Sequence, residues 1–225
     1  MKSSSKVIAK LFVLLSLLIT LAVAIGCDRE PESPPTQRVE IDLAAGELVF
    51  EDDFEREEIG ENWKTGFDGW ELSDGALKVQ GARNDALWLQ EPLPEQFRVS
   101  FVARSDSDDG DIKFEILGDG ATHESGYVGI FGGWQNRLNI IARLDEHGDD
   151  RLVGADGYSV EPGRTYQMDV VRMDDSLMWY VDGELFLVYE DENPLRGDEH
   201  RYFGFNNWET ELTFGEVRVY DLADM

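Results

Sequence analysis

The sequence contains a single cysteine among 225 residues, which limits how the chain can be stabilised. One cysteine excludes an intramolecular disulfide and any zinc site built from several cysteines. The three histidines are isolated, and no pair has the His-x-x-x-His spacing of a helical zinc site. The chain must therefore rely on a hydrophobic core, and its 42% hydrophobic residues are enough to build one.

Basic residues are also scarce, with 20 Lys and Arg against 47 Asp and Glu and a formal net charge of −27. Phosphate-backbone binding needs clustered Lys and Arg, so no nucleic-acid partner is expected. Beyond residue 26 only three lysines remain: Lys64, Lys78 and Lys113. Such an acidic surface repels other polyanions and keeps the chain soluble.

One long apolar run is present, Leu11 to Ala24, and it follows Lys2, Lys6 and Lys10. This layout is typical of a secretory signal peptide over residues 1–26. The sequence from Ala24 to Cys27 resembles the bacterial lipobox, which implies a lipidated Cys27 and an exported domain anchored to a membrane of the bacterial cell envelope. An uncleaved anchor or ordinary cleavage is the alternative, but the run falls short of the ~20 residues of a spanning helix.

Residues 27–38 follow as an acidic, proline-rich linker, and the composition is uniform over residues 39–225. We therefore predict one tethered domain. Its dominant pattern is alternation of apolar and polar residues over short runs, which indicates strands. The predicted strands are 47–53, 69–72, 76–80, 86–90, 97–104, 112–116, 127–131, 138–143, 166–170, 177–181, 185–190, 201–206 and 212–220.

Turn residues support this assignment. Asp182-Gly183 predicts a two-residue hairpin, Ser73-Asp74-Gly75 gives a weaker signal of the same kind, and Gly215 predicts a bulge. No window of a dozen residues has helical spacing. Many short antiparallel strands predict an all-β fold, a two-sheet antiparallel sandwich or jelly roll.

Several segments resemble concanavalin A-like lectin and glucanase domains. They are Phe50–Phe54 (FEDDF), Trp63, Trp70–Leu77 (WELSDGAL), Trp179–Glu184 (WYVDGE) and Phe214–Val219 (FGEVRV). Within that superfamily the chain is most similar to domains related to 3-keto-disaccharide hydrolases of exported bacterial proteins. The resemblance implies a curved sandwich whose concave sheet or rim loops bind glycans, although fold alone does not establish function.

Two segments combine tryptophan, side-chain amides and glycine: residues 131–136 (FGGWQN) and 203–208 (FGFNNW). An indole face stacks on a sugar ring, and amides pair with its hydroxyls. We predict a carbohydrate site formed by Trp134, Asn136, Asn206, Asn207 and Trp208, with Arg143, Asp145 and His147 on its rim. The alternative is a purely structural role, in which both tryptophans cap the core and the amides stabilise turns.

Acidic loops offer a weaker prediction. No cofactor is expected except calcium, for which Asp106, Asp108 and Asp111 are candidates, although their spacing does not fit an EF-hand. Solvated turns are the ordinary explanation of such runs.

Three functions follow. The first is a non-catalytic, lipid-anchored carbohydrate-binding domain. The second is a glycoside hydrolase of the 3-keto-disaccharide type, which requires a carboxylate or histidine cluster at the base of the same groove. The third is a structural or protein-interaction module, which predicts a flat apolar patch instead of a groove. No transferable catalytic motif is present, so the sequence leaves the catalytic residues unassigned.

Overall fold

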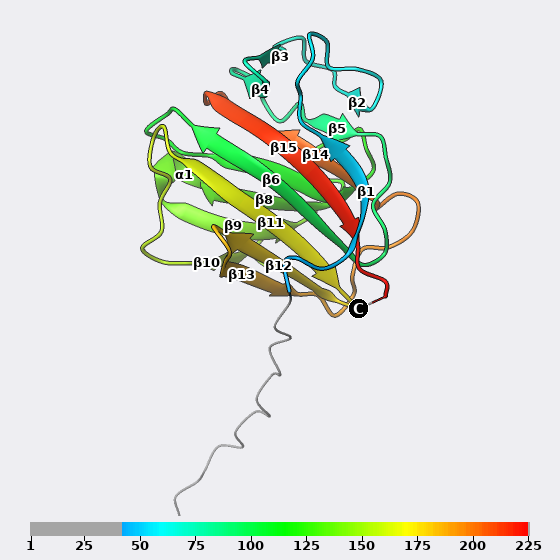
Figure 1. Ribbon diagram of the computed structural model, residues 1–225. Coiled ribbons are helices and arrows are strands. Elements are labelled where there is room, and N and C mark those ends of the chain that lie inside the picture. The colour runs from blue at the N-terminus through cyan, green and yellow to red at the C-terminus, as the bar shows by residue number, and fades with distance from the viewer. Residues whose placement is uncertain (1–41, 225) are drawn as a thin grey trace, which may run out of the picture. The chain divides into compact units, whose positions relative to one another are not determined.

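A computed structural model describes residues 42–224, which consist almost entirely of antiparallel strands in two sheets (Figure 1). The predicted signal peptide, Cys27 and the linker lie outside the described residues. The compact unit from Asp42 onward holds its own hydrophobic core. In the described residues no helix has the length and apolar character needed to cross a membrane.

The first sheet has the order β13-β12-β11-β6-β15-β4-β3, with β1 pairing the far end of β15. Figure 1 shows β1 and β15 side by side across the front sheet. The strands are β1 (Glu47–Asp52), β3 (Trp70–Ser73), β4 (Ala76–Val79), β6 (Phe97–Ser105), β11 (Thr165–Met173), β12 (Ser176–Val181), β13 (Glu184–Glu190) and β15 (Leu212–Asp221).

The second sheet has the order β10-β9-β8-β7-β14-β5-β2. Its strands are β2 (Trp63–Lys64), β5 (Leu87–Leu89), β7 (Ile112–Gly118), β8 (Tyr127–Gly132), β9 (Leu138–Arg143), β10 (Leu152–Gly154) and β14 (Tyr202–Asn206). The predicted strands are confirmed, whereas the short β2 and β10 were not predicted. Two or three residues are too few to show an alternating pattern.

The predicted turns are confirmed by backbone geometry. Asp182 and Gly183 both have positive φ, 52° and 79°, and they join Val181 to its partner Glu184. Asp74 and Gly75 do the same between β3 and β4. The register of β15 against β6 shifts between Gly215 and Arg218, as the predicted bulge requires.

The core lies between the facing surfaces of the two sheets. Alternate residues of β6 meet alternate residues of β7 there, and the Phe101 and Phe114 rings contact at 5.7 Å. Because side chains alternate along a strand, the intervening residues of β7 point to the outer face of the second sheet. These outer residues are Lys113 and Glu115, and both are buried.

The outer face of the second sheet is therefore covered. Val128, Ile130, Ile140 and Ala142 form a second apolar cluster there, distinct from the main core. The loop over residues 119–126 contacts this face where Glu124 N–H donates to Glu115, and the loop over 144–151 does so where Lys113 donates to Glu146. The two loops bury polar residues of β7 that would otherwise face solvent.

Candidate functional site

In the second sheet, β8 and β14 lie on either side of β7. Ile112 pairs with Phe131 near the end of β8, and Lys113 pairs with Asn206 at the end of β14. Because β7 lies between two antiparallel neighbours, the turns that leave β8 and β14 emerge on either side of its first residues. Those turns carry Trp134 and Trp208, so the topology brings the two tryptophan segments together.

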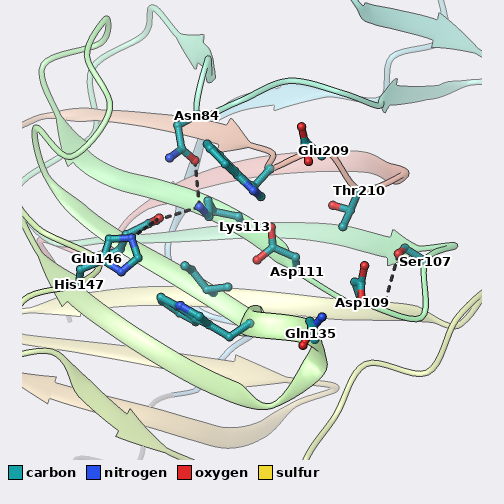
Figure 2. A pocket seen from close by; sticks show the side chains of 13 residues that line it. Asn84, Ser107, Asp109, Asp111, Lys113, Gln135, Glu146, His147, Glu209 and Thr210 are labelled. Carbon is teal, nitrogen blue, oxygen red and sulfur yellow. Dashed lines mark hydrogen bonds and ion pairs between the residues drawn. The ribbon is translucent and has the colours of Figure 1, made fainter.

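A cavity of about 530 Å³ lies at this point. Figure 2 shows Lys113 between Asn84 and Glu146 on its floor. Trp208 is 48% exposed, so its ring is accessible to a ligand. The lining residues are Asn84, Ser107, Asp109, Asp111, Lys113, Ile130, Trp134, Gln135, Glu146, His147, Trp208, Glu209 and Thr210.

Trp134 is positioned by an unusual backbone turn, α1 (Gly133–Asn136). Trp134, Gln135 and Asn136 have φ of 51°, 63° and 58°, so these residues are left-handed rather than α-helical. Left-handed geometry costs a non-glycine residue roughly 1–2 kcal/mol. The Asn136 side chain offsets this cost, because its Nδ2 donates to Val160 O at 2.7 Å and its Oδ1 accepts from Val160 N at 2.8 Å.

The Trp134 ring is further fixed by its neighbours. It packs against the outer apolar cluster, the Arg151 guanidinium lies 5.1 Å from its centroid, and the His147 ring meets it edge-on at 5.5 Å. Cationic and aromatic groups at these distances attract the indole π system. The indole is thus held in place without a ligand.

Buried amides hold the turn that carries Trp208. Asn207 Nδ2 donates to Thr210 O at 2.7 Å, and Asn206 Oδ1 accepts from Asn207 N at 2.7 Å. Asn207 O also accepts from Asn84 N at 3.0 Å, which ties the turn to the cavity wall. Asn206 and Asn207 are fully buried, and Asn136 serves its own turn. The three predicted amides therefore hold the two tryptophan-bearing turns in place and do not line the cavity themselves.

The remaining predicted residues are dispersed. His147 lines the cavity, whereas exposed Asp145 accepts from the His147 N–H. Arg143 Nε donates to Asp191 Oδ2 at 3.0 Å, and the cavity lining does not include it. Of the calcium candidates, Asp106 pairs with Arg104 and Asp108 is exposed, while Asp111 lines the cavity. Within residues 42–224 these three acids do not form a cluster of metal-ligating atoms.

Asp111 has an unusual environment at the cavity edge. Burial raises the pKa of Asp111 to about 7, the negative charges of Glu146 and Asp109 add to the rise, and Lys113 opposes it. Its Oδ2 is buried without a hydrogen-bond partner. A carboxyl group with this pKa can hold a proton near neutral pH and donate it to a bound hydroxyl or leaving group.

A second polar network lies beside Lys113. The Glu115 carboxylate is completely buried and accepts from Asn206 Nδ2, from Glu124 N at 2.9 Å and from His123 Nδ1 at 2.7 Å. His123 lines a further cavity of about 460 Å³, which shares Asn84 with the first. The two cavities thus adjoin along the outer face of the second sheet.

The tryptophan of β5 forms the floor of this second cavity. Trp88 is 2% exposed and lies over Gly118 and Gly204, where an added Cβ would come within 2.4 Å and 2.9 Å of its ring. Glycine is therefore required beneath the indole. The other residues lining the cavity are Lys64, Thr65, Gly66, Arg83, Asn84, Asp85, Ala86, Gly120, Ala121, Thr122 and His123.

The sequence did not identify Lys113, Glu146 or His123 as site residues. Lys113 and Glu115 carry one usable signal, since they alternate with the apolar residues Ile112, Phe114 and Ile116 on a central strand. Their burial depends on loops whose conformation no local pattern predicts.

Comparisons with known proteins agree with this architecture. No model of a known protein family matches the sequence. The chain is 24% identical over 157 residues to an extracellular exo-α-L-arabinofuranosidase of Streptomyces chartreusis. That match covers 69% of this chain, and the chain spans only 19% of the arabinofuranosidase.

Solved structures resemble the described domain more completely. The carbohydrate-binding module CBM66 of Bacillus subtilis has a TM-score of 0.59 at 15% identity, over 71% of this chain and 96% of the module. The laminarinase catalytic domain of Thermotoga maritima has a TM-score of 0.56 at 13% identity, over 80% and 99% respectively. A galectin-like protein of Bacillus subtilis has a TM-score of 0.60 at 13% identity, over 78% and 96%. The predicted concanavalin A-like sandwich is thereby confirmed.

Proposed function

We propose that the domain binds carbohydrate in the first cavity, between the turns that carry Trp134 and Trp208. The observation that carries this proposal is that two tryptophans far apart in sequence line one cavity, whose floor is polar. Sugar rings stack on indole faces, and Asn84, Lys113 and Glu146 supply donors and acceptors for hydroxyls. The similarity to a carbohydrate-binding module supports the proposal through the fold.

A cavity also favours this function over a protein-interaction module, which predicts a flat apolar patch. The exposed large apolar side chains of the described residues come from several separate segments: Leu48, Val49, Leu144, Val153, Tyr158, Leu185 and Trp208.

The test is glycan binding by the soluble chain from residue 38 onward, which contains the whole compact unit. A glycan array identifies the ligand, and calorimetry then compares variants. Trp134→Ala and Trp208→Ala should each weaken binding at least tenfold, or by roughly 1.4 kcal/mol. Tyr158→Ala is the matched control, because Tyr158 is an aromatic residue that is 55% exposed and lies outside the cavity. Unchanged affinity in both tryptophan variants would refute the site.

Glycoside hydrolysis is the second candidate, and Asp111 favours it. The carboxyl groups of Asp111 and Glu146 line the same cavity, and the pKa of Asp111 suits a general acid. The resemblance to 3-keto-disaccharide hydrolases gives the first substrates to try. Under this hypothesis Asp111→Asn abolishes release of sugar product while binding is retained. If a bound glycan remains intact over days with the unaltered protein, the non-catalytic function is favoured.

We infer further that the domain is exported and held to a bacterial membrane by lipid on Cys27. The signal-like first 26 residues support this inference, as does the extracellular arabinofuranosidase relative. Replacing Cys27 by Ser should abolish the acylated N-terminal peptide in mass spectrometry and release the protein from the membrane fraction. A Cys27→Ser protein that stays in the membrane fraction would instead support an uncleaved anchor.

A further inference from the structure

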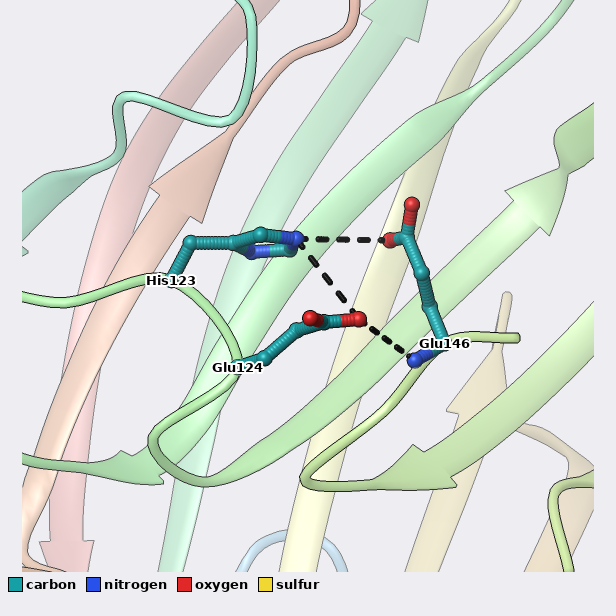
Figure 3. Close-up of side chains that lie close together, drawn as sticks. All are labelled: His123, Glu124 and Glu146. Carbon is teal, nitrogen blue, oxygen red and sulfur yellow. Dashed lines mark hydrogen bonds and ion pairs between the residues drawn. The ribbon is translucent and has the colours of Figure 1, made fainter. Parts of the chain in front are cut away.

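The two cavities meet at a cluster of which the carbohydrate proposal uses only Glu146. It consists of His123 and Glu124 from the loop after β7 and Glu146 from the loop after β9 (Figure 3). His123 Nε2 lies 3.9 Å from Glu124 Oε1 and 3.8 Å from Glu146 Oε2. One atom from each of the three side chains lies within 4.8 Å of the others.

These distances leave a gap that the side chains do not fill by themselves. Separations of 3.8 and 3.9 Å exceed hydrogen-bond range, so the imidazole nitrogen faces two carboxylate oxygens without bonding to either. Ligand atoms around a tetrahedral zinc ion lie about 3.4 Å apart, from bond lengths near 2.1 Å. The two His–Glu separations would therefore shorten by roughly half an ångström around such an ion, and the separation of the two carboxylate oxygens by at most about 1.4 Å.

The histidine is oriented from behind by a residue outside the cluster. A carboxylate accepts hydrogen bonds only, so His123 Nδ1 donates to Glu115 Oε1 and Nε2 is left to face the gap. Glu115 is itself fully buried and held by Asn206 and by the Glu124 N–H. A buried carboxylate behind an imidazole is the usual arrangement for a metal-binding histidine.

Charge also favours a divalent cation. Glu115, Glu124 and Glu146 carry three formal negative charges, and Lys113 supplies one positive charge at 2.8 Å from Glu146 Oε2. The remaining formal charge of −2, largely out of solvent, matches one divalent ion. Each carboxylate oxygen has two lone pairs, so Glu146 Oε2 can accept from Lys113 and still bind a metal.

We propose that His123, Glu124 and Glu146 bind a divalent transition-metal ion such as Zn²⁺ at the junction of the two cavities. An imidazole ligand favours this class over Ca²⁺ and Mg²⁺, which take oxygen ligands. Three protein ligands leave coordination positions open, as in zinc sites that bind water or a ligand. His123 lines one cavity and Glu146 the other, so the cluster lies where the two cavities adjoin.

The test uses the metal alone, so its result is independent of glycan binding. Zn²⁺ is titrated calorimetrically into metal-free protein at high ionic strength, because the acidic surface attracts cations. We expect one site per chain, at least tenfold tighter than Ca²⁺. His123→Ala and Glu124→Gln should each weaken it at least tenfold, and Glu115→Gln should weaken it 10–100-fold through the orientation of His123.

Two matched controls separate this site from the rest of the surface. His200→Ala removes a histidine whose Nδ1 bonds the Ser125 carbonyl, and Glu192→Gln removes an exposed acid. Both should retain the affinity of the unaltered protein. Circular dichroism checks that each variant folds, and the imidazole ¹⁵N resonance of His123 should shift on Zn²⁺ addition. The absence of a stoichiometric site, or a site retained in both His123→Ala and Glu124→Gln, would overturn the proposal.

Discussion

The Lys113 ammonium lies 2.8 Å from Glu146 Oε2, and both side chains are at least 90% buried at the first cavity. The same ammonium donates to Asn84 Oδ1 at 2.9 Å. This pair joins the floor strand β7 to the loop that carries His147. It links the sandwich to the first cavity through one buried interaction.

Breaking this pair should destabilise the fold. Lys113→Met leaves a buried carboxylate without its cation and should lower the free energy of unfolding by about 3–5 kcal/mol. Combining it with Glu146→Gln should cost less than the sum of the single changes, because neither charge then remains unpaired. Urea denaturation in EDTA measures this cycle. Lys78→Met, which removes an exposed pair with Asp74, should change stability by less than about 1 kcal/mol. Additive single effects would contradict the coupling.

Asn136→Ala should release the left-handed turn. The change removes both hydrogen bonds to the Val160 backbone and should lower stability by about 1–3 kcal/mol. Glycan affinity should fall as well, because Trp134 loses its fixed position. Gln135→Ala is the control for stability, since exposed Gln135 lies in the same turn and bonds only to the exposed Arg137. Equal stability of the two variants in thermal melts would show that Asn136 does not hold the turn.

Asp111 should make stability depend on pH. Its pKa is about 7 in the folded protein against 3.8 as a free carboxyl, so the folded state binds more protons between these values. Stability attributable to this group is therefore greatest at low pH and falls as pH rises toward 7, by at most roughly 4 kcal/mol. Asp111→Asn should melt higher than the unaltered protein at pH 8 and show a flatter profile from pH 4 to 8. A profile parallel to that of the unaltered protein would contradict this.

Arg143→Ala should separate stability from binding. The Arg143 guanidinium contacts Asp191, and Asp191 also accepts a hydrogen bond from the Tyr127 hydroxyl at 2.6 Å. Arg143 itself is not among the residues that line the first cavity. We expect a loss of about 1 kcal/mol in unfolding free energy and unchanged glycan affinity. Urea denaturation and calorimetry measure the two quantities. A tenfold loss of affinity in a folded variant would restore Arg143 to the rim of the site.

The sandwich was predictable because each long strand carries its own pattern. In β6 and β7 an apolar residue recurs at every second position, and residues such as Phe101 and Phe114 meet in the core. The Asp182-Gly183 hairpin follows from the two residues alone. Two strands deviate, because β8 and β9 carry apolar residues on both faces. Val128 and Ile130 of β8 and Ile140 and Ala142 of β9 pack on the outer face, while Phe131 and Ile141 face the core.

The site was only partly predictable. The tryptophan segments were recognisable from composition, and antiparallel pairing explains why Trp134 and Trp208 line the same cavity. The left-handed turn was not recognisable, because three consecutive non-glycine residues rarely adopt it. The association of His123 with Glu146 depends on two loops and a buried ion pair, and such contacts between distant residues leave no local spacing to detect.

Strand β7 has a consequence for any attempt to engineer this domain. Lys113 and Glu115, which hold the loops beside the two cavities, alternate with Phe114, whose ring centroid lies 4.8 Å from that of Trp179 in the core. A change of volume at Phe114 moves the same backbone that carries the two polar residues. Core mutations in β7 should consequently change ligand affinity as well as stability. Mutant libraries designed to raise thermal stability should leave this strand unchanged if ligand binding is to be kept.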